Sequence, residues 1–197
     1  MTPLFIAHRI NTRAELAAVP TEYGIEIDIR DSGPRLILQH DPFKDGEDLE
    51  DLLKEYRHSI IIFNVKSERI EPRIQELIAK YHIERYFFLD SSFPMIYNLS
   101  AVGERNIAIR FSEFEGLDTV LAMKSKVDWV WVDCFTKLPL DQEKYQLLKQ
   151  AGFRLCLVSP ELQGRGYDIS AYRNFLQENE IYFDAICTKL KSLPNWL

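Results

Sequence analysis

Eight short apolar runs, each long enough for a β-strand, recur along the chain, and most of the gaps between them hold a helical pattern. In one gap Leu49, Leu52, Leu53 and Tyr56 fall at positions i, i+3, i+4 and i+7. This spacing gives a helix one apolar face, as a helix that covers a sheet requires. The strand-like runs are residues 3–8, 24–29, 59–65, 86–90, 106–111, 128–133, 153–158 and 183–188.

Strands that alternate with helices predict an α/β fold with a parallel sheet. Eight repeats within 197 residues predict a compact (β/α)8 TIM-type barrel that forms one domain over residues 1–197. The alternative is an open doubly wound sheet, which normally has a glycine-rich phosphate loop after its first strand. That position holds residues 8–11, His-Arg-Ile-Asn, without a glycine. A turn at residues 31–35 also predicts that residues 36–39 pair back on the second strand.

Charge and cysteine content limit the classes of partner and compartment. The net charge is −6 and no long basic stripe is present, which argues against nucleic-acid binding. No apolar run reaches the roughly 18 residues of a membrane-spanning helix, and the first residues lack the pattern of a signal peptide. Cys134, Cys156 and Cys187 each lie in an apolar run, which predicts buried free thiols and a cytoplasmic setting. No pattern fixes an oligomeric state.

Polar residues stand where several of the apolar runs end. Polar side chains at the end of a buried strand are costly unless they are paired or bind something. In a barrel the carboxyl ends of the strands form the active site, so we expect these residues to converge. Their chemistry would combine two histidines for proton transfer, oxygen ligands for a hard cation and two bases for an anion. The residues are His8 and Arg9, Glu26 and Asp28, His40 and Asp41, and Asn64 and Lys66.

The ordered set of these motifs resembles the glycerophosphodiester phosphodiesterase superfamily. That superfamily also contains the sphingomyelinase D-type phospholipases and, more remotely, the phosphatidylinositol-specific phospholipases C. Ser92-Phe93 and Asp184 to Thr188 are also similar to the family pattern, but the resemblance is strongest over residues 4–66. The motifs, in chain order, are Ile-Ala-His8-Arg9, Asn11-Thr12, Gly-Ile-Glu26-Ile-Asp28, His40-Asp41-Pro and Asn64-Val-Lys66.

The resemblance implies a TIM-type barrel with a divalent cation, Mg²⁺ or Ca²⁺. It also implies roles for individual residues by position. His8 and His40 would be the acid–base pair, Glu26, Asp28 and Asn64 the metal ligands, and Arg9 and Lys66 the groups that hold the phosphate.

Three departures from the family pattern bear on these roles. Ile10 stands where the family has a glycine after His-Arg, and the loop before Asn-Thr is missing. Asn64 stands where the family has a third acidic ligand, although an amide oxygen also ligates hard cations. Only about twenty residues separate His40 from the third strand, where the family carries an insertion. Asp90, at the end of the fourth strand, is a candidate to supply the missing charge.

Four further residues lie on the fifth and sixth strand-like runs, and one of them, Arg110, has two interpretations. Arg110 shares a strand face with Ser112 and would bind phosphate or substrate, or else form an ion pair with Glu113 or Glu115. On the sixth strand, residues 129, 131 and 133 share one face. We expect Trp131 and Asp133 to line the pocket and Trp129 to lie in the core.

The leading hypothesis is a metal-dependent phosphodiester hydrolase that acts on a small or medium phosphodiester. Histidine has the side-chain pKa nearest neutrality, so His8 and His40 on opposite sides of phosphorus would serve as general acid and base. One alternative is a lyase that releases a cyclic phosphate. Another, which Asn64 favours, is a catalytically silent barrel that binds a phosphorylated ligand. Separately, Glu26 and Asp28 could be salt-bridge partners of Arg9 and Lys66 with no metal.

Overall fold

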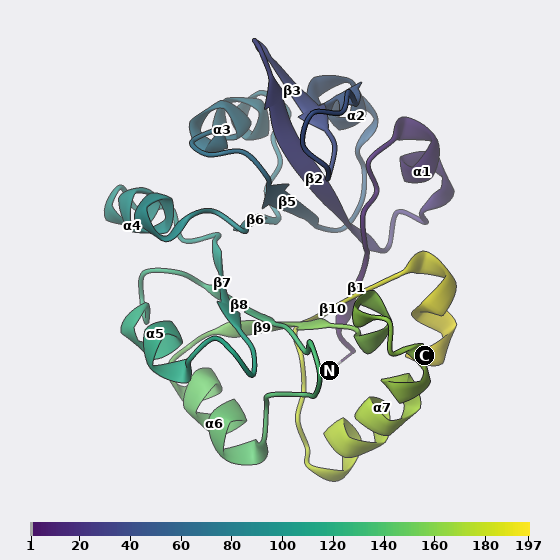
Figure 1. The fold of residues 1–197 in the computed structure, drawn as a ribbon, viewed down its shortest axis with the longest axis vertical. Coiled ribbons are helices and arrows are strands. Elements are labelled where there is room, and N and C mark those ends of the chain that lie inside the picture. Colours follow the sequence, from purple (N-terminus) through teal and green to yellow (C-terminus); the bar gives the residue numbers. More distant parts are fainter. Residues whose placement is uncertain (1) are drawn as a thin grey trace.

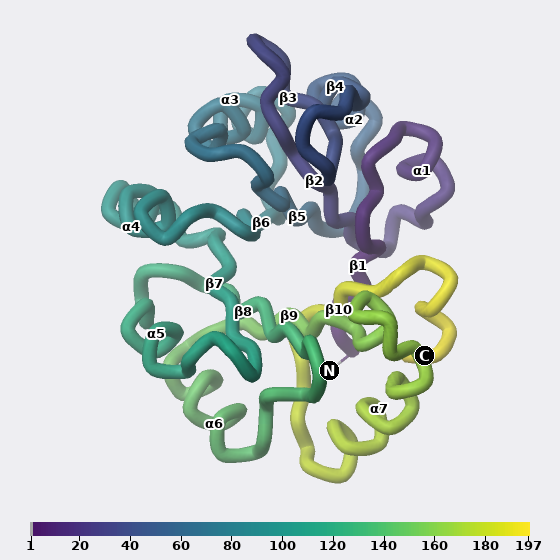
Figure 2. The backbone as a smooth tube through the Cα atoms, viewed as in Figure 1, coloured from purple at the N-terminus to yellow at the C-terminus, as the bar shows by residue number. Residues whose placement is uncertain are grey.

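The computed structural model describes residues 2–197 and shows strands around a common centre, with the helices outside them (Figure 1, Figure 2). The predicted runs all form strands. These are β1 (Leu4–Ala7), β2 (Gly24–Ser32), β5 (Ile61–Val65), β6 (Tyr86–Leu89), β7 (Ala108–Phe111), β8 (Trp129–Val132), β9 (Arg154–Val158) and β10 (Ala185–Thr188).

Most of the helices begin at recognisable start sequences. Before the first helix, the Thr12 hydroxyl accepts the Glu15 amide and the Glu15 carboxylate accepts the Thr12 amide, which is a capping box. Asp141 caps a later helix by accepting the Lys144 amide. The α-helices are α1 (Arg13–Ala18), α2 (Leu49–Glu55), α3 (Glu71–Lys80), α4 (Phe93–Ala101), α5 (Leu117–Ala122), α6 (Gln142–Gln150) and α7 (Ile169–Glu178), with 3₁₀ turns η1 (Pro160–Gln163), η2 (Gly166–Asp168) and η3 (Leu190–Asn195).

The strands follow one another around the centre in chain order. Parallel ladders join β6, β5, β2, β1, β10, β9, β8 and β7. This order confirms the (β/α)8 prediction and excludes a doubly wound sheet, in which the order reverses at a switch point. Within residues 2–197, no ladder joins β6 to β7, and the pairing at this place is an isolated bridge between Phe88 and Ile107, the residue before β7. The expectation of full closure was therefore wrong, because the sheet is not closed into a barrel at this seam.

A short antiparallel hairpin extends the sheet beside β2. The strands are β3 (Arg35–Leu38) and β4 (Glu47–Asp48), and Ile29 on β2 pairs with Leu38 on β3. This arrangement confirms the predicted turn and return strand. The Gln39 amide then donates to the Asp28 carbonyl at 3.0 Å, so the hairpin returns the next residue, His40, to the middle of β2 beside Asp28.

Two hydrophobic layers fill the molecule, one between sheet and helices and one inside the ring. Trp129 stacks on Phe87 inside the ring, with 4.6 Å between ring centroids, and Trp129 is core as predicted. Gly24 packs against Ile60, where a Cβ atom would overlap the Ile60 side chain. The three cysteines are buried and free, as expected. In the part of the chain that the structure describes, no helix is long and apolar enough to span a membrane.

Candidate active site

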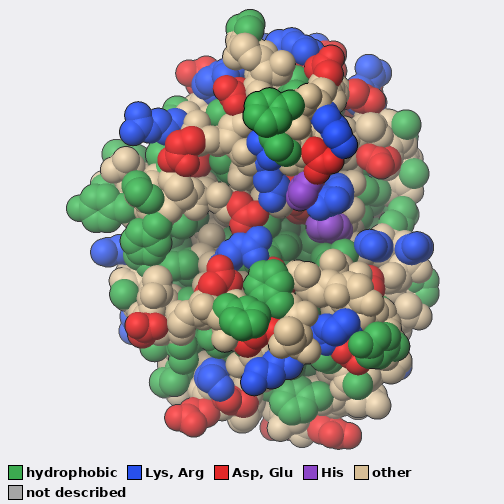
Figure 3. Space-filling view, viewed as in Figure 1, with side chains coloured by type: hydrophobic (Ala, Val, Ile, Leu, Met, Phe, Trp, Pro, Cys, Tyr) green, Lys and Arg blue, Asp and Glu red, His purple; other side chains and the backbone are tan. Residues whose placement is uncertain are grey.

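A cavity of about 510 Å³ lies at the carboxyl ends of the strands and gathers residues from both halves of the chain (Figure 3). Both sequence-predicted histidines line this cavity, although one follows β1 and the other follows the β3 strand. Its lining comprises His8, Arg9, His40, Asn64, Lys66, Leu89, Arg110, Glu115, Trp131, Asp133, Phe135, Val158, Leu162 and Gln163. All the predicted catalytic and phosphate-binding side chains, together with Trp131 and Asp133, therefore meet at one site.

The segment after β1 is fixed by hydrogen bonds to its neighbouring strands. The His8 amide donates to the Thr188 carbonyl at 2.9 Å, at the end of β10. Arg9 adopts a left-handed conformation with φ 60°, uncommon for a residue other than glycine. This conformation directs the Arg9 amide to the Glu26 carboxylate, with 2.7 Å from N to Oε2. The backbone thus holds His8 at the rim and a buried acid beside it.

Glu26, Asp28 and Asn64 form a buried oxygen-rich group next to the cavity. Asn64 is the register partner of Asp28 on the adjacent strand, and its Nδ2 donates to Glu26 Oε1 at 2.7 Å. Asp28 exchanges two hydrogen bonds with Asn11, each 2.8 Å long. Glu26 and Asp28 are at most 1 % exposed. Among residues 2–197, the buried Asn64 Oδ1 has no hydrogen-bond partner, which is costly unless a ligand supplies one.

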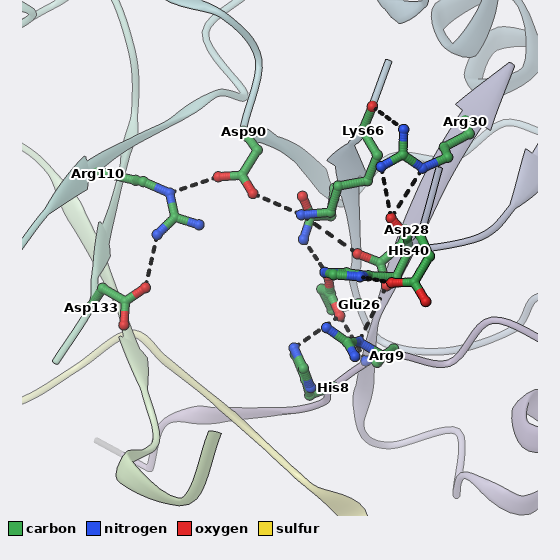
Figure 4. Close-up of polar contacts among 12 residues, drawn as sticks. His8, Arg9, Glu26, Asp28, Arg30, His40, Lys66, Asp90, Arg110 and Asp133 are labelled. Carbon is green, nitrogen blue, oxygen red and sulfur yellow. Dashed lines mark hydrogen bonds and ion pairs between the residues drawn. The ribbon is translucent and has the colours of Figure 1, made fainter. Parts of the chain in front are cut away.

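A chain of alternating acidic and basic side chains crosses the site (Figure 4). Lys66 Nζ lies 3.6 Å from Asp28 Oδ1 and 2.9 Å from Asp90 Oδ2. Arg110 then bridges Asp90 and Asp133, with its Nε 2.7 Å from Asp90 Oδ1 and its Nη1 2.8 Å from Asp133 Oδ2. Such a network fixes the position of each cation before a ligand arrives.

This network bears on three of the sequence interpretations. Arg110 pairs with Asp90 and Asp133, and not with Glu113 or Glu115, the ion-pair partners considered as the alternative to phosphate or substrate binding. Asp90 neutralises Lys66 and Arg110 in this arrangement. Arg9 also contacts the buried acids, since its Nε lies 3.5 Å from Asp28 Oδ2.

Burial and neighbouring charges shift the pKa values at the site. Desolvation, followed by the charge of Arg9, lowers the pKa of His8 to about 4, so His8 is neutral near pH 7. Burial and the adjacent Asp28 carboxylate raise the pKa of Glu26. Burial alone would raise the pKa of Asp90, but Arg110 and Lys66 hold it below the ordinary value.

His40 is oriented by its neighbour and by an arginine that the sequence interpretation missed. Its Nδ1 lies 2.9 Å from Asp41 Oδ1, which leaves Nε2 as the free ring nitrogen. The Arg30 guanidinium donates to the His40 carbonyl at 2.8 and 3.0 Å and to the Lys66 carbonyl at 2.7 Å. Arg30 shares the face of Asp28 on β2, so the alternation of the strand could have identified it.

Gln163 was also missed, and no pattern in the sequence pointed to it. Its Nε2 donates to Asp133 Oδ1 at 2.8 Å from the 3₁₀ turn after β9. The contact joins segments thirty residues apart in the chain.

The fit of a divalent cation can be judged from the donor atoms present. In the described part of the chain, no group of three or more His, Cys, Asp or Glu side chains is arranged to hold a metal ion. Two buried carboxylates, Glu26 and Asp28, nevertheless stand beside the unpartnered Asn64 Oδ1. Carboxylate and amide oxygens are the donors that Mg²⁺ and Ca²⁺ prefer, so the set is chemically suited to a hard cation.

Comparison with known proteins identifies the architecture. No protein-family model matches the sequence, and no curated protein matches it either. A solved glycerophosphodiester phosphodiesterase from Agrobacterium tumefaciens str. C58 superposes with a TM-score of 0.69 at 14% identity, over 94% of this chain and 96% of that one. The fold is that of the glycerophosphodiester phosphodiesterases.

Two further comparisons define how far this similarity extends. A glycerophosphoryl diester phosphodiesterase from Parabacteroides distasonis gives a TM-score of 0.66 at 11% identity, over 98% of this chain and 85% of that one. A tryptophan synthase alpha-subunit from Pyrococcus furiosus gives 0.60 at 13% identity, over 95% and 86%. Unrelated chemistries share the barrel, so any function must be argued from the site itself.

Proposed function

We propose that this chain cleaves a small or medium phosphodiester at the mouth of the barrel, with His8 and His40 as the acid–base pair. The observation that carries the proposal is that both imidazoles line one cavity together with Arg9, Lys66 and Arg110. A phosphodiester is an anion, and this cavity combines proton-transfer groups with fixed cations. The likeness in fold to glycerophosphodiester phosphodiesterases agrees with this chemistry.

The environments of the two histidines suggest different roles. His8 is held neutral by its lowered pKa and therefore has a free lone pair to accept a proton from the attacking hydroxyl. His40 contacts the Asp41 carboxylate through Nδ1, which orients the ring and leaves Nε2 free to donate a proton to a leaving group. We therefore assign His8 as general base and His40 as general acid, which protonates the leaving alkoxide through Nε2.

Negative charge accumulates on the phosphoryl oxygens as the bond breaks. Arg9, Lys66 and Arg110 line the cavity and would offset this charge without reorganising, because acidic partners already hold Lys66 and Arg110 in place. Arg30 donates to the backbone carbonyls of both His40 and Lys66. It therefore fixes the position of the proposed general acid, His40, relative to the phosphate-binding Lys66.

The proposal includes a divalent cation, Mg²⁺ or Ca²⁺, that Glu26, Asp28 and Asn64 would hold. When bound, the cation would supply Lewis-acid stabilisation of the phosphoryl charge. The protein residues would keep the roles given above: proton transfer by the histidines and phosphate binding by the cations. The buried free thiols also suggest that the protein works in a reducing, cytoplasmic compartment.

The test is a panel of phosphodiesters, including glycerophosphocholine and bis(p-nitrophenyl) phosphate, assayed with Mg²⁺, with Ca²⁺ and after chelation. Phosphorus NMR of the products separates hydrolysis from release of a cyclic phosphate. The variants His8→Ala and His40→Ala should each lose about 10²–10⁴-fold in kcat. His82→Asn is the matched control, because His82 is exposed and lines a separate cavity. Near-normal kcat in either active-site variant would refute the acid–base assignment.

A second candidate is a barrel that binds a phosphorylated ligand without turning it over. Asn64 in place of a carboxylate favours it, as do the ion pairs that Asp28 makes with Arg9 and Lys66. In that case inorganic phosphate or a phosphodiester would raise the melting temperature by mass action, while no member of the panel would be cleaved.

A further inference from the structure

A second cavity lies over the seam where the sheet lacks a ladder. It measures about 480 Å³ and is bounded by the end of β6 and α4 on one side and by β7 and the start of α5 on the other. Phe93, Ile96, Ala108 and Ile109 form its apolar walls. Ala108 belongs to the layer inside the ring and Ile109 to the layer between sheet and helices, so residues of both layers border the cavity near the Phe88–Ile107 bridge.

This seam cavity adjoins the candidate active site. Arg110 and Glu115 line both cavities, so the two spaces meet at those side chains. Asp90, the partner of Arg110, lines the seam cavity as well. Figure 3 shows hydrophobic side chains over α4 beside the charged side chains of the mouth. A largely apolar space therefore borders one lined by charged side chains of both signs.

Two details indicate that the seam cavity is suited to a ligand. Ser91 lines it and is 8 % exposed, and within residues 2–197 its hydroxyl has no hydrogen-bond partner. A buried hydroxyl without a partner is costly unless a ligand or water satisfies it. Phe93, at the rim, is 50 % exposed, although a ring of this size gains free energy when it is covered. The volume also lies within the range of small-molecule sites.

We propose that the seam cavity binds the apolar ester group of an amphiphilic phosphodiester whose phosphate lies among Arg9, Lys66 and Arg110. This inference rests on the proposed function and specifies its substrate class. The hydrocarbon group would enter between α4 and α5 while the charged diester stays at the mouth. Removal of the hydrocarbon from water supplies affinity, and the cations fix the position of the phosphorus beside the histidines.

The experiment measures the binding of three phosphodiesters that share one headgroup: glycerophosphocholine, hexylphosphocholine and dodecylphosphocholine. Each is titrated below its aggregation concentration by calorimetry. Affinity should rise with chain length by up to about fourfold for each methylene that is buried. In Thr119→Trp, whose indole would fill the cavity from its exposed rim, this gain should largely disappear. Thr119→Asp, which places a charge at the rim of the cavity, should also reduce the gain in affinity with chain length.

The matched control is Ala122→Trp, on the same helix and exposed but outside the cavity lining. It should keep the full dependence on chain length. An affinity that is independent of chain length, a gain unchanged in both Thr119 variants, or no binding of the dodecyl ester would each overturn the inference. Cleavage of glycerophosphocholine at an equal rate in wild type and Thr119→Trp, without any chain-length effect, would leave the proposed function standing and remove only the apolar site. Absence of glycerophosphocholine cleavage, together with binding that still depends on chain length, would remove the proposed function and leave the apolar site standing.

Discussion

Asp90 and Arg110 form an ion pair across the β6–β7 seam, with 2.7 Å between Asp90 Oδ1 and Arg110 Nε. Asp90 follows β6 in a left-handed conformation with φ 61°, and Arg110 lies on β7. The pair therefore lies where, in the part of the chain that the structure describes, the backbones are paired by an isolated bridge instead of a ladder. A side-chain contact supplies part of the cohesion that a ladder provides elsewhere in the ring.

Replacement of Asp90 by asparagine should destabilise the protein by about 1–3 kcal/mol. The change leaves Arg110 and Lys66, both largely buried, with weaker partners. Asparagine tolerates a left-handed backbone, so the effect reports the lost charge. Urea unfolding measures it, and Asp128→Asn is the control, because its partners Arg105 and Arg154 are about half exposed. Equal effects in the two variants would show that the seam pair has no special role.

Replacement of Asn64 by aspartate should tighten Mg²⁺ or Ca²⁺ binding by roughly tenfold, because it adds a charged oxygen to the donor set. The same change removes the amide donor to Glu26, so the metal-free protein should unfold at a lower temperature. Calorimetric titration and thermal unfolding with and without the cation give the two values. Asn174→Asp adds the same charge on the exposed face of α7. Metal affinity unaltered by Asn64→Asp would exclude Asn64 as a ligand.

The stability of the folded protein should fall on acidification because His8 is buried in its neutral form. Its pKa is about 4 in the folded state and near 6.5 in the unfolded chain, so between these values the unfolded chain binds the extra proton. Stability contributed by His8 is present above pH 6.5 and is lost as the pH falls toward 4. Between pH 6.5 and 5, wild type should lose about 1–2 kcal/mol more than His8→Gln in urea titrations. Equal losses of stability in wild type and His8→Gln would contradict the lowered pKa of His8.

Substitution of Gly24 by alanine should destabilise the sheet by about 1–3 kcal/mol. A Cβ atom there would overlap Cγ2 of Ile60 and lie 2.9 Å from its carbonyl oxygen, where the backbones of β2 and the approach to β5 come close. Gly166→Ala is the control, since its Cβ would make an ordinary 3.5 Å contact. Thermal unfolding of both variants decides the matter, and a neutral Gly24→Ala would disprove the close packing.

The fold followed from the sequence because apolar periodicity sets strand and helix order. The eight runs and the return strand after residues 31–35 all appear in the structure. Incomplete closure did not follow, because strand pairing across the β6–β7 seam depends on backbone geometry that no residue pattern records. The helical face of Leu49, Leu52 and Leu53 is buried as its spacing predicted.

The site was predictable where functional residues stand at strand ends. His8 and Lys66 line one cavity because parallel strands bring their carboxyl ends together, and the antiparallel return strand β3 brings His40 to the same cavity. Partners were less predictable: Arg110 bonds acids from two neighbouring strands instead of those next to it in the chain. Gln163 reaches the site from a turn whose path depends on tertiary packing.

The β6–β7 seam divides the chain into two halves that could be exchanged between proteins of this fold. Both histidines and Lys66 belong to the half that ends with α4, while the wall of the seam cavity formed by β7 and α5 belongs to the other half. The two halves share the β1–β10 ladder and the isolated bridge. A chimera could join residues 2–102 to the later half of another protein of this fold. It would keep both histidines and replace the β7–α5 wall of the seam cavity, which in our proposal contacts the apolar ester group.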